Sequence, residues 1–119
     1  MMTRPFKHIE LCKAAADGKV DKVRDLLDKC KTKEHVDDQC IFGFTAFTQA
    51  ASSEGAEQCT ILNMIWNKYK ELRCNLKEIL VDKDGCGNTV FLCAACSGNK
   101  DTTKIILSFY LEVFDDLTF

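Results

Sequence analysis

Two cysteines, Cys93 and Cys96, form the C-x-x-C spacing that zinc sites and thiol–disulfide enzymes use. A structural zinc site needs four ligands, but the chain has no second C-x-x-C pair, and its only histidines are His8 and His35. A thioredoxin-like redox site needs a preceding strand and a βαβ context, whereas these cysteines lie in a helical pattern. We therefore expect no metal, no cofactor and no redox activity here.

Catalytic motifs of other classes are equally hard to find. Gly85-Cys86-Gly87 superficially resembles a phosphate-binding loop, but neither G-x-G-x-x-G nor G-K-[ST] follows it. No serine, histidine and aspartate lie in the neighbourhood that a hydrolase family would provide, and His35 falls in a polar segment. The sequence offers no catalytic residues, so we expect a protein that is not an enzyme.

The eight cysteines raise the question of a disulfide framework. Cys12, Cys59, Cys93 and Cys96 lie among Ala, Leu and Phe within helical patterns, where a free thiol behaves as a small buried hydrophobe. Disulfide scaffolds instead place their cysteines in short loops and lack a long aliphatic pattern. We expect reduced thiols and a cytoplasmic or nuclear location.

Length and charge limit the function further. A chain of 119 residues with 46% hydrophobic and 29% charged residues fits a single globular domain. The net charge is −2 and basic residues alternate with acidic ones, so we expect no nucleic acid and no membrane as partner. The longest apolar stretch, residues 90–96, is far shorter than the ~20 residues of a membrane-spanning helix. Residues 1–10 lack the apolar run of a secretory signal.

The elements that carry these residues follow a pattern that is clearest in residues 84–107. A turn with Asp84 and Gly87 precedes Thr89, whose hydroxyl can cap a helix. A short apolar helix with an alanine pair ends at Gly98, and a second helix with an apolar face follows it.

This pattern recurs along the chain. Residues 45–51 superpose on residues 89–95 with an offset of 44 (89 − 45), and residues 9–15 superpose on 45–51 with an offset of 36 (45 − 9). We expect one domain of three copies, at roughly 8–39, 40–83 and 84–119, each with a short helix, a reversal and a longer helix. We expect the alanine pair of each copy to be structural, and Trp66, on the apolar face of the second copy's longer helix, to be a core residue. Residues 32–39 are charged and aperiodic, so we predict a loop there.

The copies resemble the ankyrin repeat family over roughly residues 8–111, most closely in the third copy, where the turn, Thr89, the alanine pair and Gly98 are all in register. The resemblance implies an all-α fold, an ankyrin-type solenoid of helix-turn-helix repeats with projecting turn fingers. The proline that the family usually has after the threonine is absent from all three copies, and so is its usual histidine, so the Thr–His hydrogen bonds between repeats are missing. The positions concerned are Glu10, Ala46 and Val90, and Cys12, Thr48 and Leu92.

The family binds other proteins through finger tips and the concave side of the first helices, and the resemblance implies the same here. Carried over position by position, the partner-binding residues are Ile41, Phe42, Phe44, Ser52, Ser53, Gly85, Cys86, Asn88, Cys96 and Ser97, with Ala16 and Asp17 from the first copy. Phe42 and Phe44 flank Gly43 in a turn, where a partner would make use of an exposed aromatic ring. The alternative for each is packing into the core beside Phe47.

A second function is open. Leu107, Leu111 and Phe114 share one face of the last helix, and a large exposed apolar patch usually marks an interface. The chain is then a fragment or subunit whose C-terminal helix mediates homo-oligomerisation or docking to further repeats.

Overall fold

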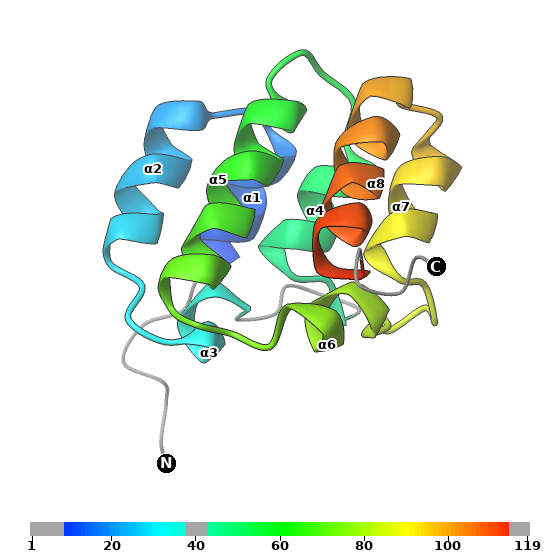
Figure 1. Ribbon diagram of the computed structural model, residues 1–119. Coiled ribbons are helices and arrows are strands. Elements are labelled where there is room, and N and C mark those ends of the chain that lie inside the picture. The colour runs from blue at the N-terminus through cyan, green and yellow to red at the C-terminus, as the bar shows by residue number, and fades with distance from the viewer. Residues whose placement is uncertain (1–8, 38–42, 115–119) are drawn as a thin grey trace.

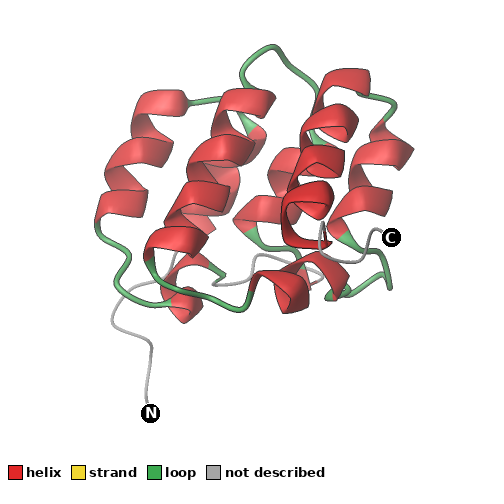
Figure 2. Cartoon of the chain, in the orientation of Figure 1, coloured by secondary structure: helices red, strands yellow, loops and turns green. Residues whose placement is uncertain are grey.

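The structure is a computed structural model that describes residues 9–37 and 43–114, and Figure 1 shows the arrangement of its helices. Every regular element within these residues is a helix, and they contain no strand (Figure 2). The predicted all-α class is confirmed. In chain order the helices are α1 (Ile9–Ala16), α2 (Val20–Asp28), α3 (Lys33–Val36), α4 (Ala46–Ser52), α5 (Gln58–Glu71), α6 (Leu76–Val81), α7 (Val90–Ser97) and α8 (Lys100–Phe114).

Six of these helices form two layers. In one layer α4 packs between α1 and α7, and in the other α5 packs between α2 and α8. Each helix of the first layer also packs against the helix that follows it in the second layer, as Figure 1 shows for α1 with α2 and α7 with α8. The three copies in the sequence are therefore three helix pairs side by side in a row.

Alanine pairs line the contacts between neighbouring copies. Ala15 and Ala51 are both 0% exposed, because the next copy packs over them. Ala95 occupies the same position in the third copy and is exposed, since no further helix pair covers it. The expectation that all three alanine pairs are core residues is therefore wrong for Ala95, and the reason is its place at the end of the row.

Local signals in the sequence set the helix boundaries. The hydroxyl of Thr45 accepts the backbone N–H of Thr48 in a reciprocal capping box. The hydroxyl of Thr89 caps α7 by accepting the N–H of Leu92. Gly98 ends α7 with a φ of 76°, in the left-handed region that glycine adopts without strain. These caps were predictable because each depends on residues within one turn of the helix end.

The loop predicted for residues 32–39 is wrong in part. It contains the short helix α3, which Thr32 caps by accepting the N–H of His35. Val36 in this helix is 0% exposed and belongs to the core. A single apolar residue shows no periodicity, so the spacing of apolar residues does not indicate this helix.

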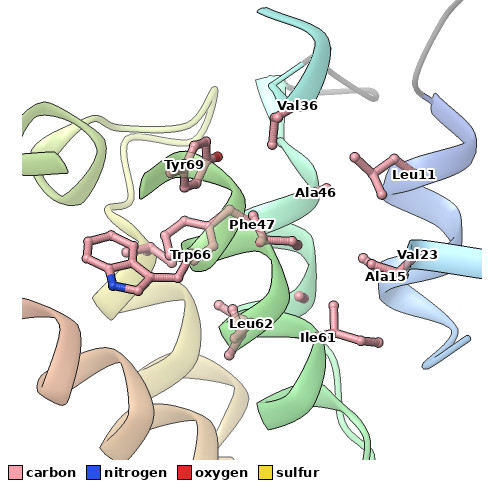
Figure 3. Close-up of a cluster of buried hydrophobic side chains, with 14 of the residues drawn as sticks. Leu11, Ala15, Val23, Val36, Ala46, Phe47, Ile61, Leu62, Trp66 and Tyr69 are labelled. Atoms are coloured by element: carbon pink, nitrogen blue, oxygen red, sulfur yellow. The ribbon is translucent and has the colours of Figure 1, made fainter. Parts of the chain in front are cut away.

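An aromatic cluster holds the second and third copies together. Trp66 of α5 stacks on Phe109 of α8 with ring centroids 4.5 Å apart, and Phe47 of α4 lies 6.1 Å from each of these rings. Tyr69 meets the edge of Phe47, and Figure 3 shows Phe47, Trp66 and Tyr69 together in the core. Such pairs add about 0.5 to 1.5 kcal/mol each beyond the burial of their area. The prediction that Trp66 is a core residue is confirmed.

The contact between the first and second copies is aliphatic. It is formed by buried side chains such as Leu11, Val23 and Ile61, and its one buried polar side chain from α5 is Gln58. The amide nitrogen of Gln58 donates to the backbone oxygen of Ala15 at 3.0 Å, while its Oε1 has no hydrogen-bond partner among residues 9–37 and 43–114. A buried polar atom without a partner costs about 1 to 3 kcal/mol. This cost weakens the contact between the first and second copies relative to the aromatic contact between the second and third.

The oxidation state of the cysteines differs from the expectation at one position. Cys12 is disulfide-bonded. The prediction of a reduced thiol is therefore wrong for Cys12, because a helical pattern shows that a cysteine faces the core but not which thiol comes within bonding distance. The free cysteines of the described residues are Cys30, Cys59, Cys74, Cys86, Cys93 and Cys96.

None of the helices in residues 9–37 and 43–114 combines the length and the apolar composition that crossing a bilayer requires.

Candidate binding surface

The turn at residues 84–88 is held by its own hydrogen bonds. Oδ1 of Asp84 accepts the backbone N–H of Cys86 at 2.8 Å and that of Asn88 at 3.0 Å. Backbone bonds from Gly87 to Asp84 and from Asp84 to Asn88 close the loop. Although burial acts to raise the pKa of Asp84, these N–H donors lower it, so the carboxylate stays charged and the turn is a rigid projection.

This turn lies against the corresponding turn of the second copy. A Cβ atom on Gly43 would fall 2.9 Å from the backbone nitrogen of Gly85, closer than real side chains approach. Gly43 also has a φ of +74°, which residues other than glycine rarely adopt. The two predicted finger turns are therefore neighbours, and glycine at position 43 is what allows them to touch.

The serines predicted as binding residues use their hydroxyl protons within the stack. Ser52 donates to the carbonyl of Thr48 at 2.9 Å, and Ser53 donates to that of Gln49 at 2.8 Å. Ser97 reaches two carbonyls, those of Ala94 at 2.7 Å and Ala51 at 3.4 Å, and so connects α7 to α4. These hydroxyls retain only acceptor capacity for a partner.

The cysteines of this region have different environments. Cys86 in the turn and Cys96 on α7 are exposed, as predicted for surface residues. Cys93 is buried, and its thiol donates to Oδ2 of Asp84 at 3.4 Å. Burial first, then Asp84, raises the pKa of Cys93 to about 11. A thiol that keeps its proton is neither a good nucleophile nor a metal ligand.

The predicted aromatic residues do not all bear on this surface. Phe44 is half-buried and packs against the core cluster, so the core alternative describes most of its side chain. Ile41 and Phe42 lie outside the described residues. The role of Phe42 as a partner contact stays a prediction.

The described site residues fall into two groups at opposite ends of α7. Gly85, Cys86 and Asn88 precede the helix, and Cys96 and Ser97 end it next to Ser52 and Ser53. The α7 residues 90–95 lie between the groups and correspond to about 9 Å along the helix axis. The exposed side of α7 between them carries Leu92, which is 43% exposed. Leu92 was not predicted as a surface residue, because its only notable feature in the sequence is that ankyrin repeats usually have a histidine at this position.

A larger apolar surface lies at the end of the row, and it includes Leu107 and Leu111, which were predicted as part of an exposed apolar face. All of the large apolar residues that are exposed within the described chain belong to α6, α7 and α8: Val81, Leu92, Leu107 and Leu111. Together with Ala95, the side chains of Leu92, Leu107 and Leu111 form what we call the apolar end surface.

Comparison of the chain with known protein families, with curated proteins and with solved structures finds no match. The function must therefore be argued from the turns, the helix faces and the end surface themselves.

Proposed function

We propose that this chain is a non-catalytic, ankyrin-type protein-interaction module. The single observation that supports the proposal best is the row of three helix pairs in which α1, α4 and α7 form one continuous layer beside two touching turns. A layer of this kind presents short helices and rigid turns at regular spacing, and it offers a broad surface to a partner without any enclosed catalytic centre. Its partner is another protein, and the cytoplasmic or nuclear location remains part of this proposal.

The surface that binds comprises the 84–88 turn and the exposed side of the first layer. Cys86 and Cys96 mark its two ends, and both are exposed. The turn is held rigid before any partner arrives, which reduces the entropy that binding has to offset. Phe44 is a poor position for a test because its loss would also disturb the core.

The test is affinity capture with the double variant Cys86→Arg/Cys96→Arg, followed by quantitative mass spectrometry. Two arginines on the surface should reduce recovery of the bound partner at least about tenfold, since their bulk and charge within an interface together cost more than about 1.4 kcal/mol. The matched control is Asn63→Arg/Asn67→Arg, which places the same side chains on the exposed side of α5 in the other layer. Equal recovery with both double variants would refute this assignment of the surface.

A second candidate function rests on the apolar end surface. Leu107 and Leu111 are 45% and 67% exposed, while Phe109 between them is buried. The positions of the first two copies that correspond to Ala95 are covered by the next helix pair, so this surface has the chemistry of an internal contact with nothing packed on it. On this reading the chain is a subunit that forms a homo-oligomer, or docks to further repeats, through α7 and α8.

Sedimentation equilibrium separates the two candidates. If the end surface pairs two copies, the wild type should associate as its concentration rises, and Leu107→Glu/Leu111→Glu should be monomeric over the same range. Asn63→Glu/Asn67→Glu, an exposed pair at the same spacing on α5, should behave as the wild type does. A wild type that stays monomeric at all concentrations would remove the homo-oligomer reading.

A further inference from the structure

A small cavity lies beside the 84–88 turn. Its volume is about 160 Å³, and it is enclosed by α3, the start of α4 and the segment that leads from α6 into the turn. Pockets for drug-sized ligands occupy roughly 300 to 1,000 Å³. The cavity therefore has room for one side chain rather than for a cofactor.

The floor of the cavity is apolar and rigid. It is formed by Phe47, Tyr69 and Ile79, all of which are buried. Figure 3 shows Tyr69 beside Phe47, with the hydroxyl group at the edge of the cluster. That hydroxyl donates to Oδ1 of Asp37, which fixes the ring in place. An aliphatic chain laid on this floor would bury apolar area without leaving a polar atom unpaired.

The rim is charged, with more acid than base. Asp37, Asp82 and Asp84 face Lys33 and Lys83. Lys33 is already held by Asp37 at 2.8 Å. Both oxygens of Asp84 accept hydrogen bonds, Oδ1 from the backbone of the turn and Oδ2 from the thiol of Cys93 on α7. Asp82 is exposed, and its carboxylate makes no hydrogen bond or ion pair within the described part of the chain. One carboxylate at the rim is therefore available, beside a lysine that is also exposed.

Carboxylates around the cavity affect the pKa values of two groups in its wall. The pKa of Lys33 is raised: burial acts to lower it, but Asp37, Asp82 and Glu78 outweigh burial. The pKa of Tyr69 is raised by burial first and then by Asp37 and Asp82. The shift of Lys33 shows that the surrounding carboxylates stabilise a positive charge here, whereas the shift of Tyr69 comes first from burial.

We infer that this cavity receives the side chain of a lysine or arginine from the protein partner. The methylene groups lie on Phe47 and Ile79, and the cationic head remains at the rim beside Asp82, as long basic side chains usually arrange themselves. The inference rests on the proposed interaction function, because it names a feature of the partner that meets the 84–88 turn. An acidic side chain would be repelled by the carboxylates of the rim. A neutral aliphatic side chain would gain only the apolar contact with the floor.

The test uses isolated side chains, so that no partner has to be known. Nα-acetyl-lysine amide and Nα-acetyl-arginine amide are titrated into ¹⁵N-labelled protein up to roughly 10 mM, a suitable range for an interaction of one side chain. We expect saturable shifts in the amide signals of Thr48, Ile79 and Asp82. The neutral and acidic controls, Nα-acetyl-norleucine amide and Nα-acetyl-glutamate amide, should bind at least about fivefold more weakly.

Variants at the rim give effects of opposite sign. Asp82→Asn should weaken binding of the lysine probe about threefold to tenfold, whereas Lys83→Gln should strengthen it because a competing ammonium group is removed. Asp101→Asn on α8, an exposed carboxylate at the opposite end of the helix pair, should change nothing. All three substitutions are at exposed positions, so we expect the fold to be retained.

The inference is overturned if neither cationic probe gives saturable shifts, if norleucine binds as well as lysine, or if Asp82→Asn binds as the wild type does. This failure is distinct from failure of the proposed function. A partner lost with Cys86→Arg/Cys96→Arg, together with silent lysine and arginine probes, would keep the interaction surface and remove only the cavity. A partner retained in that double variant would remove the surface itself.

Discussion

The two ends of the row of helix pairs have opposite chemistry. At the first copy, a groove of about 450 Å³ along α1 and α2 is lined by alternating charges, which come from Glu10, Lys13, Asp17, Lys19 and Lys22. At the third copy, the apolar end surface exposes Leu92, Ala95, Leu107 and Leu111. The first end is suited to water, whereas the last resembles a contact between copies that lacks its second half.

The difference shows that burial in this fold is supplied by the neighbouring copy. Ala15, Ala51 and Ala95 occupy equivalent positions on similar helices, yet only the first two are buried. It also bears on how copies could associate. A charged first end is a poor partner for an apolar last end, so self-association through α8 would join two last ends about a twofold axis rather than form an open chain.

The largest expected effect is the difference in stability loss between substitutions on the buried side of α8 and on its exposed side. Phe109→Ala should destabilise the protein by about 3 to 5 kcal/mol, because Phe109 fills the space beside Trp66 and Phe47. Leu111→Ala, on the same helix but 67% exposed, should change the stability by less than about 0.5 kcal/mol. Urea unfolding followed by far-UV circular dichroism on a dilute sample measures both. Similar losses would mean that the end surface is covered.

The next effect concerns the contact between the second and third copies at their turns. Gly43→Ala should cost about 2 to 4 kcal/mol, since it combines a positive φ with a clash against the backbone of Gly85. Gly87→Ala has a positive φ but meets nothing within 4 Å, so it should cost only about 1 to 2 kcal/mol. The difference between the losses of unfolding free energy in the two variants measures the effect of the contact between the turns. Equal losses would show that the two turns are not in contact.

A smaller effect should be the same at both ends. Gly18 and Gly98 reverse the chain after α1 and α7 with φ values of +72° and +76°, and neither has a neighbour closer than 3.6 Å to its added Cβ. Gly18→Ala and Gly98→Ala should therefore each cost about 1 to 2 kcal/mol. Thermal unfolding of the two variants checks this. Losses of stability that differ severalfold would show that the first and third copies differ in the reversal between their two helices, and not only in their outer surfaces.

The smallest effect is the response to acid, which should begin in the third copy. The ion pair and hydrogen bond from Lys70 lower the pKa of Glu112, although burial opposes the shift, and the hydrogen bonds of its turn lower the pKa of Asp84. A lowered pKa in the folded state contributes stability that is present above the ordinary pKa and is lost as pH falls through the folded value. Below about pH 4.5, the protection of backbone amides relative to their intrinsic exchange rates should therefore fall first in residues 84–114. Glu112→Gln should reduce this pH dependence, and an earlier loss of protection in residues 9–28 would contradict the expectation.

Much of the fold could be predicted because its signals are local. The caps at Thr45 and Thr89 and the reversal at Gly98 depend on neighbours within a few residues, and the helices follow from apolar periodicity. The short helix α3 and the disulfide at Cys12 could not be predicted in this way. Both depend on segments brought together only by folding, which spacing along the chain does not report.

The binding surface was predicted less well for the same reason. The repeat pattern of the sequence locates turn tips such as Cys86, which is exposed as expected, but it cannot tell that the hydroxyl of Ser97 donates to Ala94 within its own helix and also reaches the carbonyl of Ala51. Nor can it tell that Asp37, Asp82 and Tyr69 meet in one cavity, since they come from three different elements. Position along the repeat locates the turn tips, whereas the exposure of a helix residue such as Ala95 and the hydrogen-bonding groups that remain free depend on the packed structure.

Solvent accessibility of the alanine methyl groups tests the central claim most directly. A soluble gadolinium chelate is added to methyl-labelled protein at a concentration where the chain is monomeric, and the relaxation of each alanine methyl is measured. Row-wise stacking of three helix pairs predicts slow relaxation for Ala15 and Ala51 and fast relaxation for Ala95. Fast relaxation at Ala15 or Ala51, or equal protection of all three, would contradict it.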